Sequence, residues 1–381
     1  MSWVTLVRIK KMKDLRNNNF DLIRFLAAFQ VLILHAKKHL EIENELINLL
    51  SVNFLKFFPG VPIFFVISGF LIYSSYERSK DNIIQYIVNR CLRIFPALWI
   101  CFLLTLILLH IDFEGSLLTE SPRDIFIWSF GQISFLQFYT PDILRFWGVG
   151  TPNGSLWTIP VEIQFYIIIP IIYYVFSKFK KLWIPFVIVF LFSVAVNMLV
   201  YSYKLEGESM IEKLGSVFII PYLYYFLIGV FFKKYWSKVS VLFRDKFWGW
   251  LFSYFLFIVF FHYYMKFDTT SYWISSPVNV FADIILAGLT LSFSFSFVGI
   301  GDKILRGNDI SYGLYIYHML VVNFLVQRNF VGREIYLLVV IVVTILLAIL
   351  SWIFIEKKAL KSKHAITKAI MSMLPKRQHG I

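Results

Sequence analysis

The chain has 381 residues, of which 59% are hydrophobic and only 16% are charged, and its mean hydropathy is +0.70. Soluble domains carry about a quarter charged residues, so this composition excludes a soluble enzyme and a disordered chain. Apolar runs of about 20 residues recur, whereas a membrane β-barrel would show alternating segments of ~10 residues. The sequence therefore predicts an all-α integral membrane protein, whose 74 aromatic residues (42 Phe, 21 Tyr, 11 Trp) suit a lipid-facing surface with aromatic belts.

Ten segments are long and apolar enough to be transmembrane helices. They are residues 20–39, 57–77, 92–110, 159–177, 182–203, 215–232, 247–265, 276–299, 310–327 and 335–355. We interpret 20–355 as one membrane domain. A shorter segment, 123–140, contains Ser, Gln and Gly, and we expect it to be an interfacial or re-entrant piece of a large outer loop at 111–158.

Most of the 37 Lys and Arg residues fall on one side of this ten-span arrangement. That side includes the basic N-terminal segment 1–19 and the basic tail 356–381, so the positive-inside rule predicts that both termini are cytoplasmic. If 123–140 crossed the membrane, the later loops would invert and most of this bias would vanish. The net charge of +14 is thus explained by topology and anionic lipid rather than by nucleic acid. The tail is expected to be either a surface-bound amphipathic helix or disordered.

The first predicted span contains two ionisable residues, Arg24 and His35, that share one helical face. They are eleven residues apart, which corresponds to three turns and ~16 Å along the axis. Each side chain could simply reach the nearer membrane interface. Alternatively, both line one cavity, in which His35 acts as a general base. In the second span, Ser68-Gly69 favours close helix packing.

Two arginines, Arg90 and Arg93, lead into the third span from the cytoplasmic side. Their i, i+3 spacing points them the same way, and two guanidinium groups at one level suit phosphate binding. Ordinary positive-inside flanking explains them equally well. The two cysteines, Cys91 and Cys101, lie on the same apolar stretch and are interpreted as packing residues.

The fourth span carries Glu162 in its first turn, on the predicted outer side. Because His35 also lies about one turn from the outer end of its span, the two could meet at one depth. A His–carboxylate pair orients and charges an imidazole; alternatively, Glu162 only stabilises the helix N-terminus. In the ninth span, His318 lies near the middle of the membrane, either as a satisfied core histidine or as a functional one.

These motifs together resemble the acyltransferase 3 family, integral-membrane enzymes that O-acylate surface carbohydrates. The resemblance extends from about residue 18 to 360, with the motifs in the family's order. The matching residues are Asp21-x-x-Arg24 with His35, Phe64 to Leu71, Arg90-x-x-Arg93 before Ile94-Phe95-Pro96, Leu156-Trp157-Thr158 with Glu162 and Phe165-Tyr166, and Ser311 to Tyr315 with His318. Some members carry a fused esterase-like domain after the membrane part; this chain resembles the stand-alone type.

The resemblance implies an acyl-CoA donor, usually acetyl-CoA, with no tightly bound cofactor and no metal. It implies as acceptor a hydroxyl of a cell-surface glycan or lipid-linked saccharide, such as O-antigen, capsule or peptidoglycan, and a multi-pass location in the plasma (inner) membrane. Donor would enter from the cytoplasm, and the acceptor would be modified at the outer side. His35 would either deprotonate the acceptor hydroxyl or take the acyl group first.

The resemblance also implies that His35 is catalytic and that Arg90 and Arg93 contribute to donor binding. From their placement, Glu162 is expected to be catalytic beside His35, and Arg24 to help bind the donor. The expected supporting residues are Asp21, Trp157, Tyr166, Ser311, Tyr315 and His318.

Two other functions compete with acyl transfer. A transporter or flippase of a surface-glycan precursor would need no covalent chemistry, and a scaffold or receptor would not require intramembrane charges. No internal repeat is evident, and the arginines and the His/Glu group segregate to opposite sides, so acyl transfer is the preferred interpretation.

Overall fold

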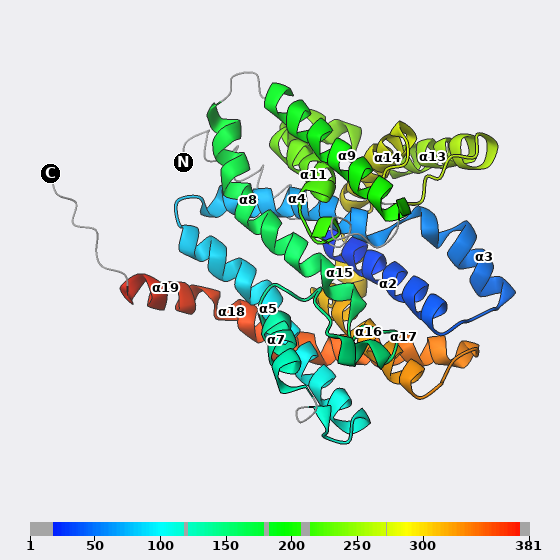
Figure 1. The fold of residues 1–381 in the computed structure, drawn as a ribbon. Helices are drawn as coiled ribbons and strands as arrows, with labels where there is room; N and C mark the ends of the chain where they lie inside the picture. The colour runs from blue at the N-terminus through cyan, green and yellow to red at the C-terminus, as the bar shows by residue number, and fades with distance from the viewer. Residues whose placement is uncertain (1–17, 118–120, 179–182, 207–213, 272, 374–381) are drawn as a thin grey trace. The chain divides into compact units, whose positions relative to one another are not determined.

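The computed structural model describes residues 18–117, 121–178, 183–206, 214–271 and 273–373 (Figure 1). These residues form helices and turns and contain no strand, which confirms the all-α prediction. The longer helices are α2 (Phe20–His39), α3 (Glu45–Asn53), α4 (Gly60–Ser79), α5 (Ile83–Asp112), α7 (Pro122–Ile133), α8 (Thr158–Lys178), α9 (Trp183–Glu206), α11 (Leu223–Lys234), α13 (Phe247–Ile258), α14 (Pro277–Phe295), α16 (Ser311–Gln327), α17 (Glu334–Ser351) and α19 (Lys363–Met373).

Short helical pieces connect or extend these elements. They are the 3-10 turns η1 (Leu55–Phe57), η2 (Asp142–Phe146), η3 (Gly154–Trp157), η4 (Ile220–Tyr222) and η5 (Ser240–Leu242), the π-helical stretches η6 (Val259–Tyr264) and η7 (Trp352–Glu356), and the short helices α12 (Trp236–Val239), α15 (Ile300–Leu305) and α18 (Lys357–Lys361).

Each of the ten predicted spans contains a helix. Among the described residues, seven helical segments are long and apolar enough to cross a membrane: Glu45–Ser79, Ile83–Asp112, Gly154–Lys178, Trp183–Tyr203, Phe247–Tyr264, Pro277–Phe295 and Glu334–Lys361. Helix α2 falls short because it carries several charged residues, and α11 and α16 because they have only 12 and 17 residues. The protein is thus an all-α membrane protein, while the count of ten spans and the cytoplasmic termini stay predictions.

Contacts divide the described chain into two compact units. The first takes in the described parts of 1–34, 44–71 and 181–312, and the second those of 35–43, 72–180 and 313–381. Helices α2, α4 and α16 each contribute residues to both units. Arg24 therefore belongs to the first unit and His35 to the second, and each is considered below with the partners of its own unit.

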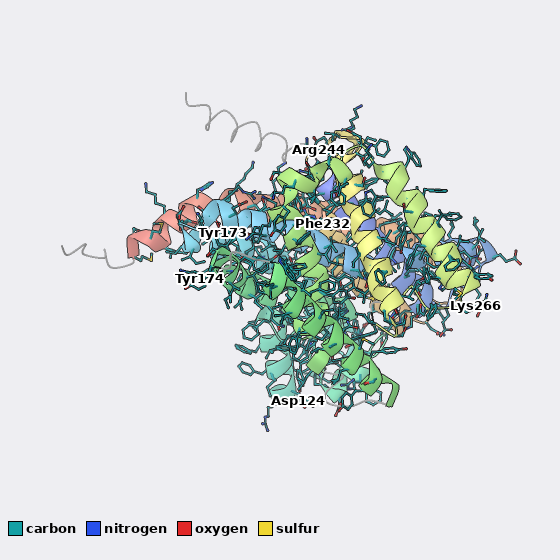
Figure 2. The ribbon with its side chains drawn as sticks, turned by 90° about the horizontal axis from the view of Figure 1, so that it is seen from above. Asp124, Tyr173, Tyr174, Phe232, Arg244 and Lys266 are labelled. Carbon is teal, nitrogen blue, oxygen red and sulfur yellow. The ribbon has the colours of Figure 1, made fainter. Side chains whose placement is uncertain are left out.

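In the first unit, α4 and α11 cross at two glycines. A Cβ atom at Gly69 would lie 2.0 Å from the carbonyl oxygen of Phe226, and one at Gly229 would lie 2.0 Å from that of Val66. Neither position can accept a side chain without moving a backbone, so the expected packing role of Ser68-Gly69 is confirmed at Gly69. Phe232 of α11, labelled in Figure 2, is partly buried and packs against the aromatic core of this unit.

In the second unit, α5 is the longest helix, and other elements pack along it. Helix α7 packs against it through buried Ile125 and Trp128. With 12 residues, α7 is about 18 Å long, less than the ~30 Å of a bilayer core. That length agrees with a segment 123–140 that does not cross the membrane.

The basic tail is helical as far as it is described, which matches the helical alternative for 356–381. Helices α18 and α19 lie beside the beginning of α5 (Figure 1). Gln85 Oε1 is 3.2 Å from His364 Nδ1, and Asn82 Nδ2 is 3.5 Å from Met371 Sδ. Residues 374–381 and nearly all of the basic segment 1–19 lie outside the described residues.

Helix α8 has one buried and one exposed side, as Tyr173 and Tyr174 show (Figure 2). The ring of Tyr173 lies 5.6 Å from that of Tyr73 and 5.3 Å from that of Tyr76, both on α4. Tyr174 is 62% exposed. The buried side also carries Tyr166, which lies two turns before Tyr173 and belongs to the candidate site.

Candidate active site

A pair of histidines joins α2 to α16 in the second unit. Nδ1 of His35 lies 2.9 Å from Nε2 of His318, and the ring centroids are 5.2 Å apart. His318 is fully buried, whereas His35 is half-buried. Within the described chain, no hydrogen bond occupies Nε2 of His35. The pair therefore holds one nitrogen of a half-buried imidazole and leaves the other without a hydrogen bond among the described residues.

Glu162 of α8 lies in a second cluster, with Tyr166 and Arg90. The Tyr166 hydroxyl donates a hydrogen bond to Glu162 Oε1, as their i, i+4 spacing permits. The guanidinium of Arg90 lies over the Tyr166 ring, 5.4 Å from its centroid, and Nη2 is 3.4 Å from Ser75 Oγ. Tyr86 donates to the Tyr166 carbonyl oxygen at 2.9 Å, which fixes α5 against α8.

The expected meeting of Glu162 with His35 does not occur as a direct contact. Among the described residues, no hydrogen bond or ion pair joins the two side chains. The segment leading into α8 is largely buried, and Glu162 itself is half-buried. Glu162 and Arg90 thus contact the same tyrosine, whereas the sequence analysis placed Glu162 on the outer side and Arg90 on the cytoplasmic side.

Arg93 faces a different partner from Arg90. Its Nη1 is 4.0 Å from Glu356 Oε2, and Glu356 is only 2% exposed. Ser351 Oγ donates to Glu356 Oε1 at 3.0 Å and lies 3.1 Å from the Tyr317 hydroxyl. The two arginines, expected to point toward one phosphate, therefore differ in their contacts: Arg93 approaches a carboxylate, whereas Arg90 lies over the ring of Tyr166. Sequence reasoning missed Glu356, although an acid at the end of a long apolar run is a detectable signal.

The segment that leads into α8 is held against the backbone of α16. Asn153 Nδ2 donates to the Ile316 carbonyl oxygen at 2.8 Å, and Ser155 Oγ lies 3.2 Å from that of Tyr315. Thr158 Oγ1 donates to the Tyr315 hydroxyl at 3.0 Å. Tyr315 is three residues before His318 on α16. The predicted block around Trp157, which is half-buried at the end of η3, thus packs next to the histidine pair.

Asn323 anchors the earlier part of this segment and was not predicted from the sequence. It is fully buried on α16; Oδ1 accepts from the Val149 amide at 2.8 Å. Nδ2 lies 3.1 Å from the Thr151 and 3.0 Å from the Pro152 carbonyl oxygen. An asparagine in the middle of an otherwise apolar span was the available signal.

In the first unit, Arg24 is paired with acids. Nη2 is 2.9 Å from Asp21 Oδ1 and also contacts Asp309 Oδ2. Asp309 is buried and accepts a hydrogen bond from Ser311 Oγ. Of the predicted supporting residues, Asp21 therefore pairs with Arg24 directly, and Ser311 is linked to it through Asp309, which was not predicted from the sequence. The charge of Arg24 is balanced by two carboxylates, so a donor phosphate would have to share it.

The described part of the chain contains no group of three or more His, Cys, Asp or Glu side chains placed to hold a metal ion. Both cysteines are free: Cys91 is exposed, and Cys101 is buried, with Sγ 3.3 Å from the Ile316 carbonyl oxygen.

Comparison with known proteins identifies the class. Residues 17–356 match the acyltransferase domain of the acyltransferase 3 family, and the chain belongs to this family. The resemblance seen in the sequence motifs is thereby confirmed. The protein is a multi-pass membrane O-acyltransferase.

Two curated relatives are similar along nearly the whole chain, and a third over about a third of it. Nodulation protein 10 of Rhizobium leguminosarum bv. viciae is 33% identical over 366 residues, covering 93% of this chain and 96% of that protein. An O-acetyl transferase of Shigella phage Sf6 is 28% identical, covering 91% and 96%. The peptidoglycan O-acetyltransferase OatA of Listeria monocytogenes is 30% identical over 131 residues, covering 32% of this chain and 21% of OatA. No solved structure matches the chain.

Proposed function

We propose that this protein transfers an acyl group, acetyl in the simplest case, from acyl-CoA to a hydroxyl of a cell-surface glycan or lipid-linked saccharide. The observation that carries the proposal is the histidine pair. His35 keeps Nε2 without a protein partner among the described residues, while His318 engages its Nδ1 at 2.9 Å. An imidazole held in this way is suited to accept a proton from a substrate hydroxyl.

The reaction needs only the two substrates and this imidazole. Nε2 of His35 removes the proton of the acceptor hydroxyl while its oxygen attacks the thioester carbonyl; the carbon–sulfur bond breaks, and CoA leaves as the thiol once sulfur is protonated. Alternatively, Nε2 attacks first, forming an acyl-histidine and releasing CoA, and the acceptor hydroxyl then takes the acyl group. Both routes give one ester and one CoA.

Arg90 is the best-placed group to bind the phosphates of the donor. It is half-buried, its ring contact with Tyr166 holds it, and among the described residues no carboxylate pairs with it. A phosphate would supply the missing anion in a charge-assisted contact. Glu162 would act with it by fixing the Tyr166 hydroxyl. Arg93 and Arg24 each have a carboxylate partner, so their contribution to donor binding would be weaker.

The names of the relatives support acetyl as the transferred group and a glycan as the acceptor. Two of them are called O-acetyltransferases, and one of these acts on peptidoglycan by name. The Lys and Arg distribution supports a plasma-membrane enzyme whose donor enters from the cytoplasm and whose acceptor lies at the outer side. Inverted membrane vesicles should then use added acetyl-CoA to label an acceptor in their lumen; use of the donor only by right-side-out vesicles would contradict this direction.

The enzymatic proposal is tested with the purified protein in lipid nanodiscs. Acetyl-CoA and saccharide fractions from the source cells are added, and free CoA thiol is measured. We expect thiol release that depends on one fraction, with an acetyl ester on its glycan by mass spectrometry. Unchanged O-acetylation of the surface glycans in a strain lacking the gene, by NMR and mass spectrometry, would contradict the proposal.

A further inference from the structure

Two apolar cavities adjoin each other in the first unit. The larger, of about 690 Å³, is lined by residues of the α3–α4 connection, α13 and η6. The smaller, of about 360 Å³, is lined by residues of the same connection, α2, α13 and α14. Phe54, Phe58 and Leu251 line both, so the cavities form one groove, called the α13 groove below. Its size is within the range of ~300–1,000 Å³ that is usual for ligand sites.

Hydrogen bonds hold the walls of the α13 groove in place. Gln30 of α2 is buried; its Nε2 donates to the Leu55 carbonyl oxygen at 3.1 Å, and its Oε1 accepts from the Gly60 amide at 3.0 Å. The hydroxyl of Tyr254 on α13 donates to the Phe57 carbonyl oxygen. Because buried hydrogen bonds are costly to break, the connection is fixed to α2 and α13, and the groove is formed before any ligand binds.

A positive charge lies at one end of the larger cavity. Lys56 is half-buried, with Nζ 4.9 Å from the centre of the Phe57 ring and 3.5 Å from His262 Nε2. The His262 ring lies 5.0 Å from that of Phe57 and 5.1 Å from that of Tyr263, and both of these residues line the cavity. Among the described residues, no carboxylate pairs with Lys56. This end of the groove therefore suits an anion.

The turn that follows η6 carries a second lysine. Lys266, labelled in Figure 2, is exposed and comes four residues after His262. The acid of the same turn, Asp268, accepts hydrogen bonds from the amide and Oγ1 of Thr270 at 2.9 and 2.8 Å. Two lysines and one engaged carboxylate leave this end with a positive charge.

The predicted topology places this positive end at the outer membrane surface. In the ten-span arrangement, span 57–77 begins on the outer side and span 247–265 ends there. Lys56 and Lys266 flank these two span ends. The apolar cavities then lie toward the membrane interior. A lipid with a phosphate head has the same order of charged and apolar parts, and it would enter from the side where the acceptor is proposed to be modified.

We propose that the α13 groove binds the lipid of a lipid-linked saccharide, with an isoprenoid chain in the cavities and its phosphate at Lys56. The role of this lipid as carrier of the acceptor rests on the proposed function, whereas the binding itself does not. Aromatic side chains supply much of the larger cavity: Phe54, Phe57, Phe58, Trp248, Phe252 and Tyr254. Their flat faces suit the planar alkene units of an isoprenoid chain, and a phosphate would give Lys56 a charge-assisted contact.

Binding is measured without turnover, by photo-crosslinking of the full-length protein in phosphatidylethanolamine nanodiscs. The probe is a polyprenyl phosphate with a diazirine on its chain, and the cross-linked peptides are mapped by mass spectrometry. We expect saturable cross-links to α13, η6 or the α3–α4 connection, which unlabelled polyprenyl phosphate abolishes. Equal competition by phosphatidylglycerol would show an ordinary bilayer-lipid crevice, and equal competition by inorganic phosphate a phosphate site; either result would overturn the inference.

Two variants test the two ends of the groove. Lys56→Ala should weaken binding about 10-fold or more, because it removes the charge-assisted contact. Leu251→Trp should abolish the cross-links, because it fills the place where the cavities meet. The controls are Lys238→Ala, at an exposed lysine on the predicted cytoplasmic side, and Leu256→Trp, at an exposed position of α13 that lines neither cavity. Both controls should bind as the wild type does, and thermal unfolding shows which variants fold.

The outcomes separate this inference from the proposed function. Wild-type binding by folded Lys56→Ala would overturn the inference, whether or not Leu251→Trp folds, and acyl transfer by such a protein would leave the proposed function intact. The expected binding in a protein that never releases CoA from acetyl-CoA would support the lipid site and defeat the proposed function.

Discussion

Arg93 and Glu356 form an ion pair, with Nη1 and Oε2 4.0 Å apart, that ties α5 to η7 in the second unit. The carboxylate is almost completely buried, and its other oxygen, Oε1, accepts a hydrogen bond from Ser351 Oγ. Arg93, which the motif assigns to binding of the acyl-CoA donor, is thus also the counter-ion of a buried carboxylate.

Glu356→Ala should lower the free energy of unfolding by about 2–4 kcal/mol, because it leaves the Arg93 charge in a largely buried site. Arg145→Ala is the matched control: its pair with Asp142 is exposed and should be worth at most about 1 kcal/mol. Thermal unfolding in detergent measures both. Equal and small losses of unfolding free energy in the two variants would show that the buried ion pair does not stabilise the fold.

Arg90→Ala should raise KM for acetyl-CoA by about 10–100-fold, with little change in kcat, because it removes a charge-assisted phosphate contact. Arg90→Lys should substitute poorly, since a lysine lacks the planar group that stacks on Tyr166. Initial rates over a range of acetyl-CoA concentrations test this. A variant with normal KM would assign Arg90 to topology or packing.

Glu162→Gln and Tyr166→Phe should behave alike if Glu162 acts through the Tyr166 hydroxyl. Each removes or weakens one hydrogen bond beside Arg90, so KM for acetyl-CoA should rise roughly 3–10-fold. The opposite pattern is a large fall in kcat for Glu162→Gln with Tyr166→Phe near normal. That result would restore Glu162 as the charged partner of the imidazole.

Gly229→Ala should destabilise the first unit by about 1–3 kcal/mol, because its Cβ would meet the Val66 carbonyl oxygen and force α4 away from α11. Gly249→Ala, on α13, is the control: a Cβ there meets nothing within 4 Å, so the better helix former should be neutral or stabilising by up to ~1 kcal/mol. Thermal unfolding compares the two variants; a loss of similar size in both would contradict the close crossing.

The positions of the helices could be predicted because apolar length and flanking charge are local properties of the sequence. The predicted span 20–39 coincides with α2, and 159–177 differs from α8 by one residue at each end. Helix contacts are not local. The sequence placed Glu162 at the depth of His35 from span geometry alone, whereas its contact with Tyr166 depends on how side chains pack.

The histidine pair is likewise a contact between two helices that the sequence could not predict. His35 was identified from its spacing to Arg24, and His318 from its motif, but no sequence feature said that the two faces meet. Asn153 and Asn323 were missed because each bonds to backbone carbonyl groups, which every residue type presents alike. Polar residues next to or inside apolar runs were the only available signal for them.

We propose that His35 carries out acyl transfer from acyl-CoA. The most direct test is transfer of isotope-labelled acetyl from acetyl-CoA to the glycan acceptor by wild-type protein, His35→Ala and His39→Ala in nanodiscs at matched amounts of folded protein. His39 lies one turn further along α2 and outside the pair. We expect His35→Ala to lose at least about 100-fold of the transfer rate and His39→Ala to stay near the wild-type rate. Labelled glycan formed by folded His35→Ala at the wild-type rate would contradict the claim.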